Sequence, residues 1–388
     1  MSFIARRPIV LAGSSLYLLA CSQGGKQDRI ESEVRVTAEH HMFGFKAEQA
    51  FPQFPIRTEN LQVESGVLAF NDQSQWTLDG TAGSRYELAK TGALVFRVPN
   101  GRNADLVFQG AYGLSGDTGL FFFADTVKPM VGLFFGARTV RAAANVIGDF
   151  HVFSLLVLTT PNAVVGPNSV ARAFAGSLTT NATGEVTAGS GRESTGSDLT
   201  LTGNLRAFND GTVEVGLSLD TPTLRTPRSF TTAATVTQSL PVTTSVMLGH
   251  ETADNDAAGM VALVRKRDGR ANLADLAGDY WVGALTVFAN PSNAGTEGSY
   301  GTLTVTTTGG WRLDAKDSTA TYRLSGSLEI DADGTIRLTN NATREAWKGA
   351  FDQDYQTIVF VDNDITGASA NRPELNLFLA LRKATTPP

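Results

Sequence analysis

One motif of small, apolar and aromatic residues occurs in the same order in the first and last thirds of this chain. It consists of Gly-x-Leu, Trp-x-Leu-Asp, Tyr-x-Leu and a second Gly-x-Leu. These elements begin at Gly66, Trp76, Tyr86 and Gly92 in the first third, and at Gly301, Trp311, Tyr322 and Gly326 in the last. The middle third keeps Gly-x-Leu at Gly176 and Gly203 but lacks the tryptophan. A shared order at similar spacing predicts three tandem copies of one structural unit.

The ends of the three units agree as well. Each closes on an apolar run followed by an arginine, which is Arg138, Arg265 or Arg382. Two units open on Gly-Asp-aromatic, at Gly148 and Gly278, and residues 38–42 are the degenerate counterpart in the first unit. These signals predict units at residues 31–140, 141–268 and 269–388.

Within each unit, short runs of alternating apolar and polar residues are separated by Gly, Asn and Asp, a pattern typical of β-strands. Asp333-Gly334 between two such runs predicts a hairpin. The strands expected in the last unit are 280–288, 300–308, 311–315, 320–330, 335–339, 344–353, 357–362 and 375–383. Short connections without crossover helices favour antiparallel meanders. We therefore expect an all-β chain of three tandem antiparallel meander units, each a small up-and-down barrel of about eight strands.

An aromatic residue on the first strand and an arginine on the last resemble the calycin superfamily of lipocalins, fatty-acid-binding proteins and avidins. In those barrels the arginine packs across the aromatic ring at the barrel floor, which implies barrel-closing roles here. The matching residues are Tyr280 or Trp281 with Arg382, Phe150 with Arg265, and Arg138 with His40 or His41. Arg382 could alternatively be solvated, with Lys383 taking its place on the opposite face.

The N-terminus has the features expected of an export signal. Arg6 and Arg7 precede an apolar stretch that ends in Leu-Leu-Ala-Cys at Cys21. This run resembles the lipobox of bacterial lipoproteins, which implies a signal peptide at 1–20, cleavage between Ala20 and Cys21, and acylation of Cys21. Residues 21–30 are small and polar and predict a flexible tether. Ser22 in place of aspartate favours the outer membrane, by the same resemblance. Gram-negative surface lipoproteins that carry barrels beside a Gly-rich tether, such as transferrin-binding lipoproteins, offer an analogy.

Composition narrows the function classes. The net charge of −6 and the scattered basic residues argue against nucleic-acid binding. Cys21 is the only cysteine, so disulfides and cysteine-ligated metals are not expected. The four histidines form no metal or catalytic motif. We expect no catalytic residues, no metal and no cofactor.

Two runs of the first unit, 119–124 and 130–135, are apolar on both strand faces. One face should fill a barrel, and the other should be covered by a neighbouring unit, a partner or lipid. Packing between units is the favoured interpretation. The alternative is an interaction surface, formed by Phe121, Phe122, Phe123, Phe134 and Phe135.

The sequence thus predicts a lipoprotein held in the outer membrane by its acyl chains, facing the periplasm or the cell surface. Its expected role is non-catalytic binding of an envelope protein or a small ligand. A structural or assembly scaffold is the second hypothesis, and an enzyme of unknown class is the third. A hollow barrel would favour a ligand carrier, and barrels filled by their own side chains would favour a scaffold.

Overall fold

The computed structural model describes residues 34–384 apart from 51–59, 101–102, 115–119, 127–129, 140–142, 144, 159–170, 211, 222–227, 240–242, 252–256, 268–270, 289–294, 332 and 363–373. The predicted signal peptide, Cys21 and the tether lie outside the described residues.

The described chain is almost entirely β-structure. The first barrel contains β1 (Ala38–Glu48), β2 (Leu61–Phe70), β3 (Gln75–Leu78), β4 (Thr81–Leu88), β5 (Ala93–Asn100), β6 (Asn103–Tyr112), β7 (Phe121–Asp125) and β8 (Met130–Arg138). The second contains β9 (Gly148–Leu158), β10 (Ala171–Thr180), β11 (Val186–Glu193), β12 (Asp198–Ala207), β13 (Val213–Asp220), β14 (Arg228–Ser239), β15 (Thr243–Glu251) and β16 (Ala257–Arg265). After the short helix α1 (Leu273–Leu276), the third contains β17 (Gly278–Phe288), β18 (Gly295–Val305), β19 (Gly310–Lys316), β20 (Thr321–Ile330), β21 (Ile336–Asn340), β22 (Ala346–Phe351), β23 (Thr357–Asp362) and β24 (Glu374–Arg382).

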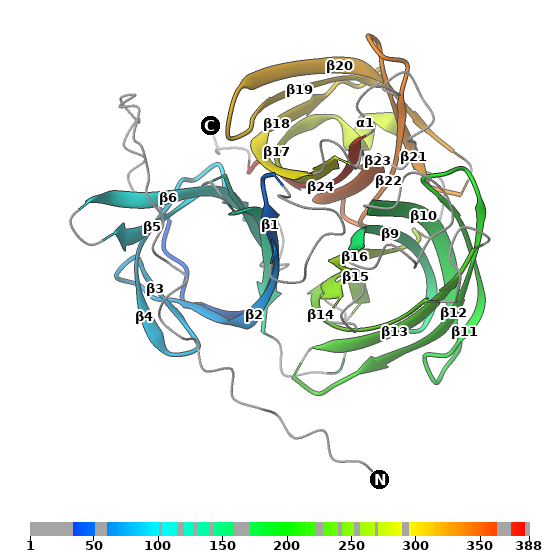
Figure 1. The fold of residues 1–388 in the computed structure, drawn as a ribbon, viewed down its shortest axis with the longest axis horizontal. Coiled ribbons are helices and arrows are strands. Elements are labelled where there is room, and N and C mark those ends of the chain that lie inside the picture. Colours follow the sequence, from blue (N-terminus) through cyan, green and yellow to red (C-terminus); the bar gives the residue numbers. More distant parts are fainter. Residues whose placement is uncertain are drawn as a thin grey trace.

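Each set of eight strands forms a closed antiparallel meander, so the predicted fold class is confirmed. Consecutive strands pair with one another, and the first strand of each barrel also pairs with the last. All eight strands expected in the last unit are present, with ends shifted by a few residues. Closure leaves none of the described strands as an unpaired edge, which removes the usual template for edge-to-edge aggregation. Figure 1 shows the three barrels grouped around a centre rather than strung in a line.

The turn between the second and third strands is built alike in all three barrels. The backbone N–H of Asn71, Asn181 or Thr306 donates to the carbonyl four residues later. The fourth residue of each turn has positive φ, at Ser74 (59°), Gly184 (81°) and Gly309 (83°). This conformation costs glycine nothing, whereas Ser74 must adopt a region that serine rarely visits.

Only part of the repeated motif occupies equivalent positions. Gly66, Gly176 and Gly301 lie on the second strand of their barrels, opposite Met42, Val152 and Val282 of the first. Trp76 and Trp311 both follow the shared turn by two residues. The later matches are wrong. Gly92 lies in a turn, whereas Gly203 and Gly326 lie within strands. The residue of the last unit equivalent to Tyr86 is Leu328, because both donate their N–H to the positive-φ residue of the shared turn.

The three barrel interiors have separate cores. The first is aromatic, and Phe70 makes ring contacts there with Tyr86, Phe96, Tyr112 and Phe121. In the third, Trp347 stacks on Phe360 and Phe378. The second is mainly aliphatic, from Val152, Leu178, Leu201, Val215 and similar residues. In each described core the barrel's own buried side chains pack against one another.

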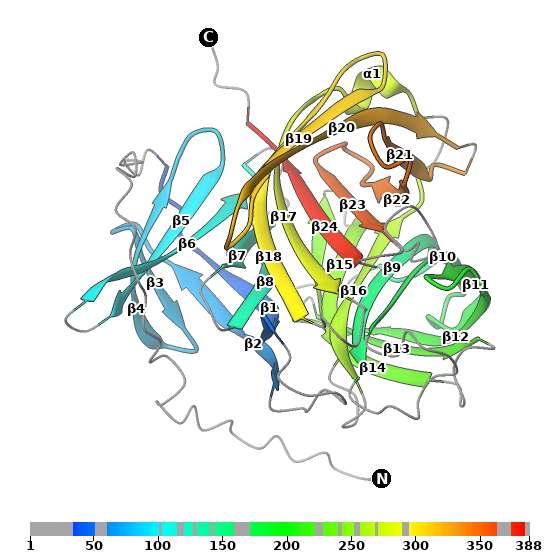
Figure 2. The same ribbon diagram turned by 45° about the horizontal axis from the view of Figure 1, so that its top comes forward.

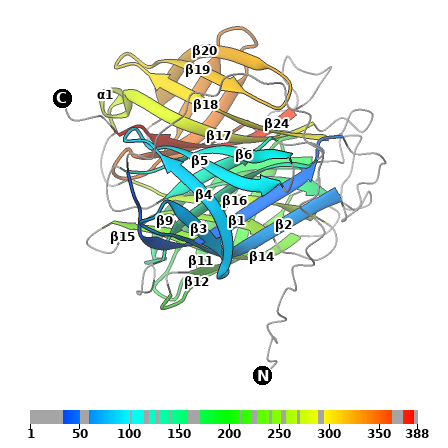
Figure 3. The same cartoon turned by 90° about the vertical axis from the view of Figure 1, so that its left-hand side faces the viewer.

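A fourth core lies between the barrels. It is formed by the outward faces of the first and last strands of each barrel, joined by residues of β2, β6, β7, β10, β22 and β23. Representative members are Phe45 of β1, Leu155 of β9 and Leu285 of β17, each fully buried. Figure 2 shows these closing strands near the middle of the molecule, and Figure 3 views the molecule from the side of the first barrel. The strands that close the barrels are therefore the strands that join them.

The double-sided apolar runs of the first barrel contribute to both kinds of core. Phe121 and Phe134 are buried inside the first barrel, and Phe122 and Phe135 are buried in the core between barrels. Phe123 is partly buried against the interior of the first barrel. The suggested interaction surface at these five phenylalanines is therefore corrected: neighbouring strands of the same chain cover the rings.

Close approach of the first and third barrels requires a glycine at one point. A Cβ on Gly283 of β17 would lie 2.5 Å from a ring carbon of Phe122 and 2.9 Å from a methyl of Leu133. Polar contacts flank this junction, where Thr296 donates its hydroxyl to the carbonyls of Ala47 and Glu48. Among the described residues, no helix has the length and apolar character needed to cross a membrane.

Phe122→Ala should lower the free energy of unfolding by about 3–5 kcal/mol, because it opens a cavity where two barrels meet. Phe208→Ala is the matched control, since Phe208 is only partly buried, beside a turn, and should cost about 1 kcal/mol or less. Urea titrations monitored by circular dichroism measure both values. Equal costs for the two variants would mean that the barrels do not depend on the core between them.

Candidate functional site

The closing arginine of the second barrel covers its floor. The Arg265 guanidinium lies over the Phe150 ring, 4.6 Å from the ring centre. Its two terminal nitrogens donate to the carbonyls of Ile147 and Asn145, both at 2.6 Å. Phe150 and Arg265 are directly opposite each other on β9 and β16. The arginine thus ties the last strand to the segment that enters the first.

Arg382 occupies the same place in the third barrel. It pairs with Tyr280 across β17 and β24, and its guanidinium is 5.7 Å from the Tyr280 ring centre. It donates to the carbonyls of Asp275 and Ala277 around the short helix, and to that of Tyr355. The Tyr280 hydroxyl donates to the backbone carbonyl of Leu276 at 2.8 Å. Helix α1, which the sequence analysis did not predict, therefore covers this end of the third barrel.

Trp281 and Lys383 have a different role from Tyr280 and Arg382. They lie on the outer face, where the Lys383 ammonium is 4.1 Å from the Trp281 ring centre. The Trp281 indole donates to the carbonyl of Thr91 in the first barrel at 2.9 Å. Trp281 therefore helps to join two barrels and does not close one.

The first barrel departs from the pattern. Arg138 is opposite His40 on β1 and β8, but its side chain is exposed and does not cover a ring as Arg265 and Arg382 do. His40 is fully buried and contacts the Tyr112 hydroxyl through Nε2 at 3.0 Å. The barrel-closing role expected of Arg138 is therefore corrected. The ring opposite Arg138 is the imidazole of His40, which is smaller and more polar than the rings of Phe150 and Tyr280. The Tyr86 hydroxyl instead bonds to the backbone of Val36, in the segment before β1, and donates to the carbonyl of Asn71 in the shared turn.

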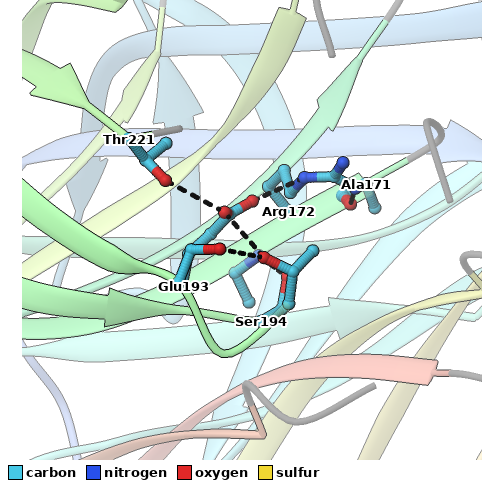
Figure 4. Close-up of polar contacts among 8 residues, drawn as sticks. Ala171, Arg172, Glu193, Ser194 and Thr221 are labelled. Atoms are coloured by element: carbon cyan, nitrogen blue, oxygen red, sulfur yellow. Dashed lines mark hydrogen bonds and ion pairs between the residues drawn. The ribbon is translucent and has the colours of Figure 1, made fainter. Parts of the chain in front are cut away.

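A buried ion pair lies inside the second barrel, at the end opposite Arg265. Arg172 Nε is 2.5 Å from Glu193 Oε1, and both side chains are 4% exposed. Figure 4 shows the Glu193 carboxylate between Arg172 and Thr221. The Thr195 and Thr221 hydroxyls donate to its second oxygen. Such a pair is favourable only when its remaining lone pairs are satisfied, and the two hydroxyls supply donors to Glu193 Oε2.

A small cleft separates the first and third barrels. It has a volume of about 130 Å³. One wall comes from Val107 and Gln109 of β6, Ala124 of β7 and Thr126, and the other from Tyr300 of β18, Lys316 of β19 and Asp317. Gln109 is opposite Ala124, and Tyr300 is opposite Lys316, so each wall is a cross-strand pair. Nothing in the sequence pattern brings these residues together.

His41 and His151 lie where barrels meet. His41 Nε2 contacts the carbonyl of Asp210 in the second barrel at 3.3 Å. His151 of the second barrel is buried beside the Asp333–Gly334 turn of the third. In the described part of the chain, no three His, Cys, Asp or Glu side chains are grouped so that they could hold a metal ion.

Comparisons with known proteins give no family. No family model and no curated protein matches the chain. Among solved structures, it is similar to a double mutant of the vaccine antigen Transferrin Binding Protein B from Haemophilus parasuis, at 8% identity over 90% of this chain and 76% of that one, with a TM-score of 0.30. It is also similar to a protein of unknown function from the DUF3598 family of Nostoc punctiforme, at 11% identity over 61% of this chain and 96% of that one, with a TM-score of 0.22. TM-scores this low carry no conclusion about the present chain.

Arg265→Met and Arg382→Met should each lower the free energy of unfolding by at least about 2 kcal/mol, because each removes charged hydrogen bonds and a cation–π contact. Arg138→Met is the control at the equivalent register position, and its exposed side chain should contribute less than about 0.5 kcal/mol. Chemical denaturation of the three variants makes the comparison. A cost for Arg138→Met as large as the other two would contradict the assigned geometry.

The stability of the protein should fall between pH 7 and pH 5. Burial lowers the pKa of His40 to about 3 and that of His151 to about 4. The unfolded chain therefore binds more protons below pH 6.5, and each histidine costs about 2 kcal/mol at pH 5. Burial also raises the pKa of Asp352 to about 6, which acts in the opposite direction by about 1 kcal/mol.

Denaturation at the two pH values measures the net loss, expected to be about 2–3 kcal/mol. In His151→Gln the loss should shrink by about 2 kcal/mol. An unchanged pH dependence in this variant would show that His151 takes up its proton normally in the folded protein.

Proposed function

We propose that this protein is a lipid-anchored, non-catalytic component of the bacterial cell envelope that binds a protein partner through its outer surface. The packed aromatic interiors of the first and third barrels carry this proposal. Aromatic side chains occupy the first and third barrels, and aliphatic side chains with the Arg172–Glu193 pair occupy the second. A carrier of a lipid-sized ligand needs an internal cavity of about 300 Å³ or more. The loops and outer strand faces are therefore the surfaces left for recognition.

The fused arrangement supports a second candidate function, that of a scaffold. Three barrels that share one apolar core form a rigid body, and a rigid body suits a spacer between envelope components. Both candidates use the outside of the molecule, and neither uses a catalytic residue. They differ in whether one surface patch or the whole body is required.

Photo-crosslinking in cells separates the two candidates. A photoreactive amino acid is introduced at exposed turn positions of the three barrels, such as Asp72, Thr183 and Asn341. A binding module should crosslink to one partner from one group of neighbouring positions. A scaffold should crosslink to different proteins from different barrels. Native mass spectrometry provides a further test, because a lipid retained inside a barrel would contradict the filled-interior argument.

The anchor is tested by Cys21→Ala. Without the cysteine, the precursor should stay uncleaved or the protein should leave the membrane fraction, because no thiol remains to be acylated. Metabolic labelling with an alkyne fatty acid should mark the wild type and leave the variant unlabelled. Ser22→Ala is the control and should label normally. An unlabelled wild type would remove the lipid anchor from the proposal.

A further inference from the structure

The cleft between the first and third barrels exists only because the two barrels are docked. Strands β6 and β7 of the first barrel and β18 and β19 of the third supply its walls. Tyr300 is held in place by stacking on Trp281, with ring centres 5.8 Å apart and planes 10° apart, and by contact with Phe122. These rings pack against the shared core. The cleft is therefore built on a rigid base.

Polar groups of both signs face this cleft. Gln109, the Tyr300 hydroxyl and the Lys316 ammonium can all donate hydrogen bonds, and within the described part of the chain none of the three has a hydrogen-bond or ion-pair partner. Asp317 is different. Its Oδ1 accepts from the backbone N–H groups of Thr319 and Ala320, which fixes the carboxylate and leaves Oδ2 for another donor.

The size and charge of the cleft select the class of ligand. About 130 Å³ is far more than one water needs and less than a drug-sized pocket provides. A dianion such as phosphate would meet one ammonium but also the fixed carboxylate of Asp317. A small molecule that carries both a carboxylate and an ammonium satisfies the two charges at once.

We propose that this cleft binds a small zwitterionic amino acid. The ligand carboxylate is bound by Lys316, Tyr300 and Gln109, and its ammonium is bound by Asp317. The apolar atoms of Val107 and Ala124 border the space and limit the side chain to a small one. This site lies outside the barrel interiors and does not depend on the protein-binding role proposed above.

Ligand-observed NMR on the full chain in detergent tests the proposal with four probes at constant ionic strength: L-alanine, acetate, ethylammonium and phosphate. L-alanine should bind saturably with a dissociation constant in the millimolar range or below, about tenfold or more tighter than the other three. Lys316→Met and Gln109→Leu should each weaken alanine binding by about tenfold, the loss expected for a charged or well-placed hydrogen bond. Both side chains are at least partly exposed, so these variants should fold.

Lys348→Met is the matched control, because this lysine lies on β22, which does not border the cleft, and alanine binding should be unchanged. Three results would overturn the proposal: no saturable alanine binding, phosphate or acetate binding at least as tight as alanine, or equal binding by the Lys316→Met variant and the wild type. Tyr300→Phe removes only the hydroxyl of this side chain. If its melting temperature is unchanged, its alanine binding tests separately whether that hydroxyl contacts the ligand.

Discussion

The apolar core shared by the three barrels is the interaction on which the rest of the structure depends. Closing a meander brings its first and last strands together, and here those strands are apolar on both faces. One face fills the barrel and the other would lie in water if the barrel stood alone. Burial at about 25 cal/mol per Å² makes that exposure costly. Docking the three pairs of closing strands against one another buries all the outer faces together.

The three barrels share one strand arrangement, but different residues cover the closed end of each barrel. Arg265 and Arg382 each cover an aromatic ring and hold the entering segment by its carbonyls. The first barrel has His40 at this place and relies on the hydroxyls of Tyr86 and Tyr112. Either a guanidinium or a phenol can donate a hydrogen bond to a backbone carbonyl, so the first barrel can close this end without a covering arginine. The shared turn after the second strand varies less, because its positive φ restricts the backbone itself.

Because the described interiors are packed and the barrels are docked, the junctions between barrels and the outer surface are the places left for binding. The Arg172–Glu193 pair is buried inside the second barrel, and burial lowers the pKa of His40 and His151, so none of these groups faces the outer surface. The cleft at Lys316 and Asp317 is different, since its polar groups face open space. Such a site arises from assembly: either barrel alone would offer only half of it.

The sequence by itself determined the strands, their antiparallel order and the closure of each unit, because period-two alternation and turn residues are local signals. It also predicted that Phe150 lies against Arg265 and that Tyr280 or Trp281 lies against Arg382, since closure brings the first and last strands together. It could not align Tyr86 with Leu328, because the strands between them differ in length. For Phe122 and Phe135 it favoured packing between units but left an interaction surface open, because alternation reports that a face is apolar and not which neighbour covers it. Only the tertiary structure decided that the barrels cover one another, that a short helix plugs one floor, and that Gln109 faces Lys316 across 207 residues of chain. These contacts depend on how finished barrels dock, and no local pattern encodes that geometry.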